Sequence, residues 1–379
     1  MITLALQMLF GDRGKFLLLL SGIAFATLLM TQGLALFFGL MGFFSSTVDN
    51  VRSPVWVVDP IVQQVADNQP LRDTELQRVR SVPGVRWASP VFLGITQARI
   101  SGTAISKQVF VVGIDSTTLI GAPTTLLQGN LLDLQNPEAV FVDEQSLRFL
   151  SLPGVPPLRV GDTFEMNDRT ARIVGLCRTK AGQGGAPYIY TTFDRARDFV
   201  PSTRRIVSYV LALPEPGESP ESLAKRITAE TGLQGLTESE FKLKSIIWAL
   251  KFSPIPFVVG VIVGLGFIVG TVISGQTFYT FVLENSRYFG VLRAMGTSTL
   301  RLSAMITAQA LTIGFIGYGL GMGCISLVLL ALPEGRVPLL LLWPVPLVVL
   351  VAVVGICLLA TVLGIWRVAR LEPAMVFRA

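Results

Sequence analysis

Residues 252–283 read FSPIPFVVGVIVGLGFIVGTVISGQTFYTFVL and contain no Asp, Glu, Lys or Arg. The stretch is longer than the ~20 residues that a membrane-spanning helix needs. A buried core helix of a soluble protein rarely has this length and seldom lacks a polar face. The stretch therefore predicts a helix that crosses a membrane.

Three other stretches without charged residues have the same character, namely 16–44, 302–332 and 337–366. The first is about twice as long as the ~7–15 apolar residues of a signal peptide and has no Ala-x-Ala cleavage site, so we interpret it as a retained span. The sequence thus predicts an α-helical membrane protein with four transmembrane helices, at 16–44, 252–283, 302–332 and 337–366.

The chain between the first two predicted spans, residues 45–250, has the sequence pattern of a soluble α+β domain. Short β-prone runs are bounded by Gly, Pro and Asp, and helix-prone runs lie between them. The predicted strands are 55–58, 108–112, 139–142, 171–174, 188–190 and 208–212. The predicted helices are 74–80, 143–150 and 220–231, the last capped by Ser219 or Glu218 and ended by Gly232. Aromatic residues within the strands are expected to belong to the core.

The distribution of Lys and Arg predicts the orientation of the spans, because these residues concentrate on the cytoplasmic side. The two ends of the chain and the loop 284–301 together hold eight bases and three acids, whereas 45–251 holds 22 bases and 21 acids. We therefore expect a short interfacial helix at 1–15, the loop 284–301 and the tail 367–379 to be cytoplasmic, and residues 45–250 to be extracytoplasmic. The basic pI is explained by these bases near the membrane, so no nucleic-acid partner is predicted.

Several classes of active site are excluded by composition. The chain has no histidine and three cysteines, and it has no Cys-x-x-Cys motif. Zinc sites of the usual His/Cys kind and Ser-His-Asp or Cys-His catalytic arrangements are therefore absent. We expect no catalytic residues, no metal site and no cofactor in this chain.

Glycines recur at four-residue spacing in the second predicted span, as Gly260 with Gly264 and Gly266 with Gly270. Small residues at this spacing let helix backbones approach closely in a membrane. We predict that these four glycines pack against another helix, either within the chain or in a second copy. Glycine is also dense in the third span, at 314, 317, 319, 321 and 323.

The loop after the second span reads ENSRYFGVLRAMGTS over residues 284–298. It predicts a helix from Glu284 to Met295, ended by Gly296, in which Glu284 and Arg287 share one face. An apolar stripe is formed by Tyr288, Val291, Leu292 and Met295. Such an amphipathic helix either lies on lipid or docks into a groove of a cytoplasmic protein. The residues alone leave both readings open.

This segment resembles the signature E-x-x-x-E-I-G-V-L-R-A-L-G-A-S of the FtsX-like, MacB-type permeases of ABC transporters, which residues 290–298 match closely. Asn285 and Tyr288-Phe289 depart from it. The ending VARLEPAMVFR at 368–378 and the entry LFGDRGKF at 9–16 are also similar to the family, as is the layout of one span, an outer domain and three spans. Among subgroups, the short chain is similar to the DevC-like exporters.

The resemblance implies a homodimer that works with ABC ATPase subunits. The chain has no Gly-x-x-x-x-Gly-Lys-Ser/Thr loop, so ATP would be bound by a separate ATPase and the chain would be no enzyme on its own. The residues expected to couple to the ATPase are Glu284, Arg287, Gly290, Val291, Leu292, Arg293, Ala294, Met295 and Gly296. Movement of the ATPases would be transmitted across the cell (inner) membrane to the outer domain.

The implied function is export or efflux, with membrane lipid and a periplasmic adaptor protein as further partners. Two alternatives remain open from the sequence. One is extraction of lipoprotein or lipid from the outer leaflet, and the other is a transmembrane regulator that signals to a cell-wall hydrolase.

Overall fold

The computed structural model describes residues 7, 8, 10, 13–67, 69–100, 105–150, 157–200, 207–331 and 338–369. The predicted interfacial helix at 1–15 and tail at 367–379 lie mostly outside these residues. Two compact units make up the chain. Unit 1 comprises Met1–Gly39 and Pro254–Ala379, and unit 2 comprises Leu40–Ser253.

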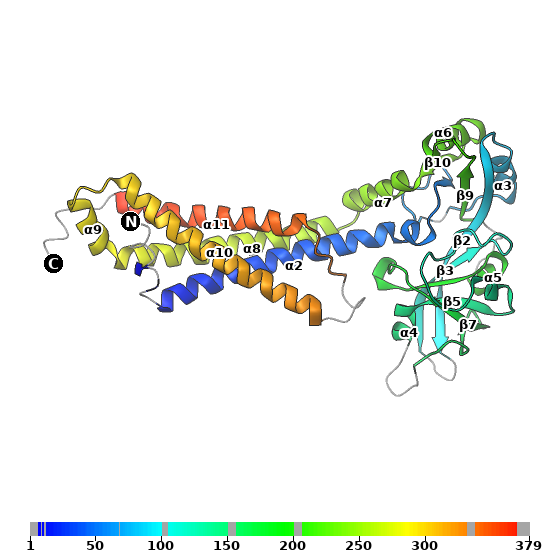
Figure 1. Cartoon of the computed structure of the whole chain (residues 1–379), viewed down its shortest axis with the longest axis horizontal. Helices are drawn as coiled ribbons and strands as arrows, with labels where there is room; N and C mark the ends of the chain where they lie inside the picture. Colours follow the sequence, from blue (N-terminus) through cyan, green and yellow to red (C-terminus); the bar gives the residue numbers. More distant parts are fainter. Residues whose placement is uncertain are drawn as a thin grey trace. The chain divides into compact units, whose positions relative to one another are not determined.

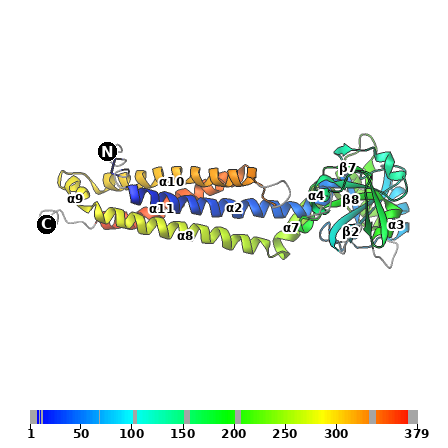
Figure 2. The same ribbon diagram turned by 90° about the horizontal axis from the view of Figure 1, so that it is seen from below.

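Unit 1 is a bundle of long apolar helices that lie side by side in two views (Figures 1 and 2). Within the part of the chain that the structure describes, four helices are long and apolar enough to cross a membrane. They belong to α2 (Arg13–Val51), α8 (Ile255–Glu284), α10 (Thr299–Ala331) and α11 (Pro344–Ala369), and the short helix α9 (Ser286–Ala294) joins α8 to α10. A common core is formed by side chains of all four long helices, among them Ile23, Phe278, Ile313 and Ile356.

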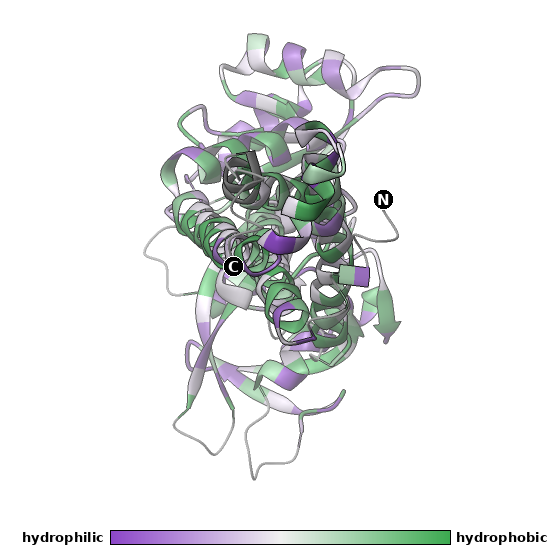
Figure 3. Ribbon diagram, turned by 90° about the vertical axis from the view of Figure 1, so that its left-hand side faces the viewer, coloured by the Kyte–Doolittle hydropathy of each residue, from purple (hydrophilic) through white to green (hydrophobic). Residues whose placement is uncertain are grey.

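The helices of unit 1 consist largely of hydrophobic residues, which are green in the ribbon of Figure 3, and many of these residues are exposed. Phe257 is 77% exposed, Val272 62%, Val351 66% and Leu330 83%. Large exposed apolar side chains in such numbers are unusual for a protein in water but are what hydrocarbon requires. The bundle therefore has the surface of a membrane protein.

Two helix starts differ from the charge-free stretches. The fourth long helix begins at Pro344 rather than at Val337, because residues 338–343 form a loop in which the Leu340 amide donates to the Ala35 carbonyl at 3.0 Å. The helix that follows unit 2 begins at Ile255 rather than at Phe252, because Ser253 is extended, Pro254 is the N-cap of α8 and Pro256 lies in its first turn. The absence of charged residues shows how long an apolar stretch is, but it does not show where within that stretch the helix begins.

Unit 2 is an α+β domain built on one ten-stranded sheet. The strands are β1 (Val55–Val58), β2 (Val85–Ile100), β3 (Ser106–Ile114), β4 (Leu126–Gln128), β5 (Ala139–Asp143), β6 (Thr163–Met166), β7 (Arg169–Cys177), β8 (Tyr188–Thr192), β9 (Tyr209–Pro214) and β10 (Gln234–Thr237). The helices are α3 (Asp73–Arg80), α4 (Glu144–Leu150), α5 (Phe193–Phe199), α6 (Pro220–Thr231) and α7 (Glu238–Phe252), with short 3-10 turns at Leu131–Gln135 and Gln183–Gly185.

The strand order is β10-β1-β9-β2-β3-β8-β5-β7-β4, with β6 paired to β2 and β7. Among the strand pairs that the described residues form, β3·β8 and β5·β7 are parallel and the others are antiparallel. The long strand β2 joins the two halves of the sheet, since its first part pairs with β9 and its second part with β3. All six predicted strands lie in this sheet.

The predicted helix 220–231 coincides with α6, and its ends follow the capping rules. The Ser219 hydroxyl accepts from the Ser222 amide at 3.2 Å, so Ser219 rather than Glu218 is the cap. Gly232 ends the helix at φ +70°. The predicted helix 143–150 corresponds to α4. Its predicted start is wrong by one residue, because Asp143 is the last residue of β5.

The aromatic residues of the strands form the core, as expected. Five of them are at most 3% exposed, namely Phe92, Phe110, Tyr188, Tyr190 and Tyr209. Trp56, Tyr209 and Phe241 of α7 contact one another with ring centroids 5.6–5.8 Å apart. This cluster packs α7 onto the sheet.

Asp143 is a fully buried carboxyl group at the point where β5 meets α4. One oxygen accepts from the Thr179 amide at 2.9 Å, and the other finds no donor among the described residues. Burial raises the pKa of Asp143 to about 6, although the hydrogen bond from the Thr179 amide opposes this shift. The folded chain therefore holds this proton more tightly than the unfolded chain does.

This raised pKa predicts that unit 2 loses stability as pH rises from about 4 to about 6. Between these values the native state binds more protons than the unfolded state, and the loss reaches about 3 kcal/mol at most. Asp143→Asn keeps an acceptor for the Thr179 amide and removes the titration. The pH dependence of thermal unfolding of the chain in detergent should therefore flatten in the variant. Identical slopes for both proteins between pH 4 and 7 would contradict the assignment.

Candidate functional site

The loop between α8 and α10 is a folded hairpin that contains the short helix α9 (Figure 1). Helix α9 ends in a Schellman motif. The Gly296 amide donates to the Arg293 carbonyl at 3.0 Å and the Thr297 amide to the Leu292 carbonyl at 3.1 Å. Gly296 adopts φ +87°, which other residues reach only with strain. The glycine that marks the end of the helix in the sequence is thus required by the backbone.

Phe289 fixes α9 to the ends of α8 and α10. Its side chain is 1% exposed and lies in a cluster with Phe281, Val282, Leu302 and Ile306. The sequence pattern does not single out Phe289, because the apolar stripe at helical spacing passes through Leu292 instead. Leu292 only borders this cluster.

The opposite face of α9 presents apolar side chains to the exterior. Tyr288 is 64% exposed, Val291 44% and Met295 76%, and Leu300 at the start of α10 is 81% exposed. The three α9 residues belong to the predicted stripe. A helix anchored by one aromatic residue and exposing three apolar ones at spacings of three and four has the form of a helix that fits a groove.

The remaining predicted coupling residues divide between the two faces. Arg287 and Ala294 are exposed, Arg293 is half-buried and Gly290 is buried. Gly290 follows Phe289 on the side that packs into unit 1.

Glu284 differs from the prediction. It is the last residue of α8, and α9 begins only at Ser286, so Glu284 and Arg287 do not share a helix face. Its carboxylate instead forms an ion pair with the Lys15 ammonium at the start of α2. The sequence offers no signal for this pair, because its members are far apart in the chain.

The four predicted packing glycines fall into two groups. A Cβ added at Gly266 would lie 3.2 Å from Cγ of Met30, and one added at Gly270 would lie 2.6 Å from Cβ of Ala26. Both glycines thus pack against α2 within the chain. Gly260 and Gly264 have no atom within 4 Å of an added Cβ.

The glycines of α10 also divide into those that pack against α2 and those that have open space around them. A Cβ at Gly321 would lie 2.6 Å from Cβ of Thr27 and 2.7 Å from the backbone oxygen of Ala24. Gly319, two residues earlier on the same helix, has open space around it. Helix α2 is therefore approached closely by both α8 and α10. Its own Gly22 and Gly33 contribute as well, since an added Cβ there would lie 2.8 Å from Ile273 and 3.0 Å from Val263 of α8.

The last turns of α2 are bonded into unit 2. The Tyr188 hydroxyl lies 3.0 Å from the Ser46 hydroxyl and 2.7 Å from that of Thr47. Asn50 exchanges two hydrogen bonds with the backbone of Lys180, at 2.7 and 2.8 Å. These contacts hold one end of α2 to the strands of the sheet.

Asp49 connects α2 to two further elements of unit 2. Its carboxylate pairs with the Lys180 ammonium at 2.8 Å and with the Lys242 ammonium of α7 at 2.5 Å. Partial burial opposes the charge of Lys242, but hydrogen bonds to the Asp49 and Glu238 carboxylates outweigh it and raise the pKa of Lys242. The ion pairs thus join α2 and α7, the two helices by which the sheet is connected to the rest of the chain.

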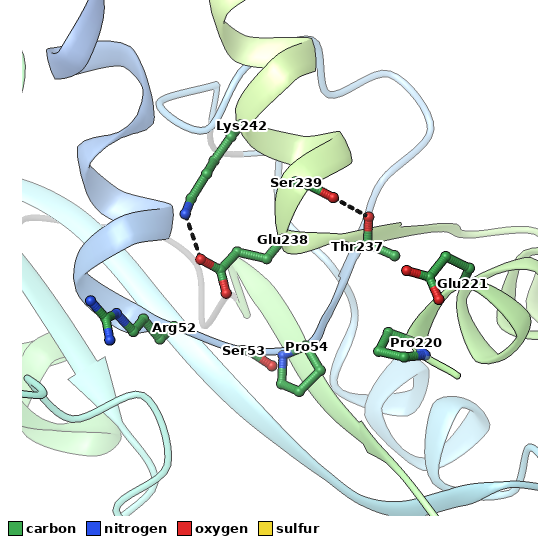
Figure 4. A pocket seen from close by; sticks show the side chains of 9 residues that line it. All are labelled: Arg52, Ser53, Pro54, Pro220, Glu221, Thr237, Glu238, Ser239 and Lys242. Atoms are coloured by element: carbon green, nitrogen blue, oxygen red, sulfur yellow. Dashed lines mark hydrogen bonds and ion pairs between the residues drawn. The ribbon is translucent and has the colours of Figure 1, made fainter. Parts of the chain in front are cut away.

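A hollow of about 630 Å³ lies beside this ion pair, between α6, the start of α7 and the α2–β1 connection (Figure 4). Glu238 and Lys242 on its wall pair with each other, and the Thr237 and Ser239 hydroxyls lie 3.2 Å apart. The described residues contain no group of three or more His, Cys, Asp or Glu suited to a metal ion. We assign no ligand to this hollow.

Comparisons with known proteins match both units. A family profile described as the MacB-like periplasmic core domain matches residues 16–230, and one described as the FtsX-like permease C-terminal domain matches residues 260–373. Two uncharacterized ABC transporter permeases, from Mycobacterium tuberculosis and Mycobacterium bovis, are each 25% identical to this chain. The matches cover 94% of this chain and 93% of each relative.

Two solved structures also match. The periplasmic region of MacB from Actinobacillus actinomycetemcomitans matches with a TM-score of 0.39 and 15% identity, over 51% of this chain and 92% of that one. The extracellular domain of the noncanonic ABC-type transporter YknZ from Gram-positive bacteria matches with a TM-score of 0.35 and 13% identity, over 49% and 99%.

The glycine contacts predict that Gly321→Val destabilises unit 1 and Gly319→Val does not. The new side chain at 321 would meet the α2 backbone and cost about 1–3 kcal/mol, whereas that at 319 enters open space. Both variants lose a glycine from the same helix, so the comparison isolates packing from helix propensity. Thermal unfolding in detergent measures the difference, and equal melting temperatures would contradict the described approach of α10 to α2.

Proposed function

We infer the function of this chain from the family to which it belongs, the MacB-type and FtsX-like permeases of ABC transporters. The matched MacB-like profile covers more than half of the chain, and the relatives that match along its length are named ABC transporter permeases. A permease of an ABC transporter implies an ATPase partner. The four apolar helices fit the membrane location that such a permease requires.

We propose that the ATPase is a separate polypeptide, that it binds the ATP, and that α9 is the helix that docks into it. The observation that carries the proposal is the exposed apolar face of α9, formed by Tyr288, Val291 and Met295 on a helix fixed by Phe289 and Gly296. A rigid helix loses little conformational entropy on docking, which favours tight binding. The excess of bases around this hairpin supports a cytoplasmic location for it.

We further propose that movement of the ATPase is transmitted along α2 and α8 to unit 2. The Lys15–Glu284 ion pair links the start of α2 to the end of α8, next to α9. At its other end α2 is hydrogen-bonded to Tyr188 and Lys180 of unit 2. Unit 2 would then lie outside the cytoplasm and act on cargo or on an adaptor protein, with export as the outcome.

The docking proposal predicts that Val291→Asp and Met295→Asp each abolish capture of the ATPase while the chain still inserts and folds. A charge at the centre of an apolar interface costs 2 kcal/mol or more, about 30-fold in affinity. The native complex would be isolated through a tag on the chain, and the bound ATPase identified and quantified by mass spectrometry. These positions are better suited than Gly290, which is buried, or Arg293, which is half-buried.

Leu132→Asp is the matched control, because it makes the same change at a 60% exposed leucine in unit 2. It should leave the ATPase bound. Undiminished ATPase in the Val291→Asp and Met295→Asp preparations would show that α9 is not the docking helix.

We also propose that two copies pair through the face of α8 that carries Gly260 and Gly264. These glycines have open space around them, and Phe257, Val261 and Ile268 on the same helix are exposed. Small residues on an exposed helix face let a second helix approach closely in a membrane.

Gly264→Leu should therefore weaken the dimer at least tenfold, because a bulky side chain prevents this approach. Gly319→Leu, which enlarges an equally open glycine on α10, should leave the dimer intact. Single-molecule photobleaching in nanodiscs or light scattering in detergent would measure the oligomeric state. A dimer that persists in Gly264→Leu would refute this interface.

A further inference from the structure

Helix α7 exposes an apolar face that no described residue of unit 2 covers. Its buried side, formed by Phe241, Ser245 and Ala249, packs onto the unit. On the outer side Leu243 is 58% exposed, Ile247 40%, Leu250 46% and Phe252 69%. A helix that faced only water would rarely expose four large apolar side chains, so we expect another apolar surface to cover them.

Part of this face is hollowed into a groove of about 430 Å³. It is lined by Leu243, Ile247, Trp248 and Phe252 along α7, together with Gln63. The Trp248 ring lies 5.9 Å from that of Phe252 and 6.1 Å from that of Phe44, so it forms a fixed wall. The volume lies within the range of about 300–1,000 Å³ that small-molecule sites occupy.

The rim of the groove is positively charged. Lys244 and Lys251 line it, and the acid in its lining, Glu240, accepts from the Thr237 amide and hydroxyl at 2.8 and 2.9 Å. Lys244 donates to the Gln234 amide oxygen at 2.6 Å, which leaves two of its three N–H groups for another acceptor. Partial burial lowers the pKa of Lys244 despite the opposing charge of Asp67, so a further anion nearby would stabilise its charged form.

The groove is also separated by only a few residues of the chain from a helix that could span a membrane. Phe252 ends α7, and α8, which has the length and composition of a membrane span, begins at Ile255. Three residues span at most about 10 Å. Helices that combine Trp, Phe and Leu on one face with lysines beside it bind at the boundary between headgroups and acyl chains.

We propose that this groove binds an anionic phospholipid, with an acyl chain on Leu243, Ile247 and Trp248 and the phosphate held by Lys251 and Lys244. The charge of the rim favours this occupant over a second copy of the chain. Symmetric pairing of two α7 faces would bring lysines against lysines, which is unfavourable. The site is independent of ATPase docking, so its failure would leave the permease function unaffected.

The test uses the full chain in nanodiscs that contain a phosphatidylglycerol with a photoactivatable group on its acyl chain. Cross-linked peptides are mapped by mass spectrometry. We expect labelling within residues 238–252 from phosphatidylglycerol and at least fivefold less from phosphatidylcholine with the same acyl chain. Lys244→Ala and Lys251→Ala should each reduce labelling about fivefold, the change that corresponds to about 1 kcal/mol per lysine.

Lys225→Ala is the matched control, since Lys225 is an exposed lysine of α6 away from the groove. It should leave the labelling unchanged, and thermal unfolding would verify that all three variants fold. Equal labelling by the two lipids, labelling confined to the spans, or labelling unaffected by either lysine change would overturn the proposal. The proposal would also be overturned if Ile247→Asp dissociated a dimer without altering lipid labelling, because α7 would then be a contact between copies.

Discussion

The close approach of α2 to α8 and α10 is the contact on which the rest of unit 1 depends. Without a hydrophobic effect between helices in lipid, packing distance decides which helices associate. Gly266, Gly270 and Gly321 supply that distance, and each faces α2 rather than lipid. The apolar residues on the other faces need only be compatible with hydrocarbon, which explains why their pattern is uniform and carries little information about the arrangement.

Much of the fold could be predicted because its signals are local. The ends of α6 follow from Ser219, Pro220 and Gly232, which act within one turn. Strand β2 was not predicted, since its sixteen residues include Pro90 and Gly94. Its second part pairs with the next strand, β3, but its first part pairs with β9, which lies more than 100 residues further along the chain. A short window of sequence does not contain that second pairing.

In the candidate site, too, contacts between distant parts of the chain could not be predicted from local sequence patterns. The predicted stripe contains Tyr288, Val291 and Met295, which are exposed, but the periodicity of apolar residues does not show which of them are buried. Phe289 took that role because it meets the ends of α8 and α10, while Leu292 lies at the edge of their cluster. The partner of Glu284 could not be predicted either, since Lys15 is brought to it only by the packing of α2 against α8.

The two connections between the units differ in stiffness. Helix α2 runs from Arg13 to Val51 without interruption, whereas α7 and α8 are separated by an extended Ser253 and by Pro254, which has no amide hydrogen to donate. A continuous helix conveys axial displacement and resists torsion. The helical hydrogen-bond ladder is therefore interrupted at Ser253–Pro254, where the chain leaves unit 2, whereas α2 carries it unbroken from unit 1 into unit 2.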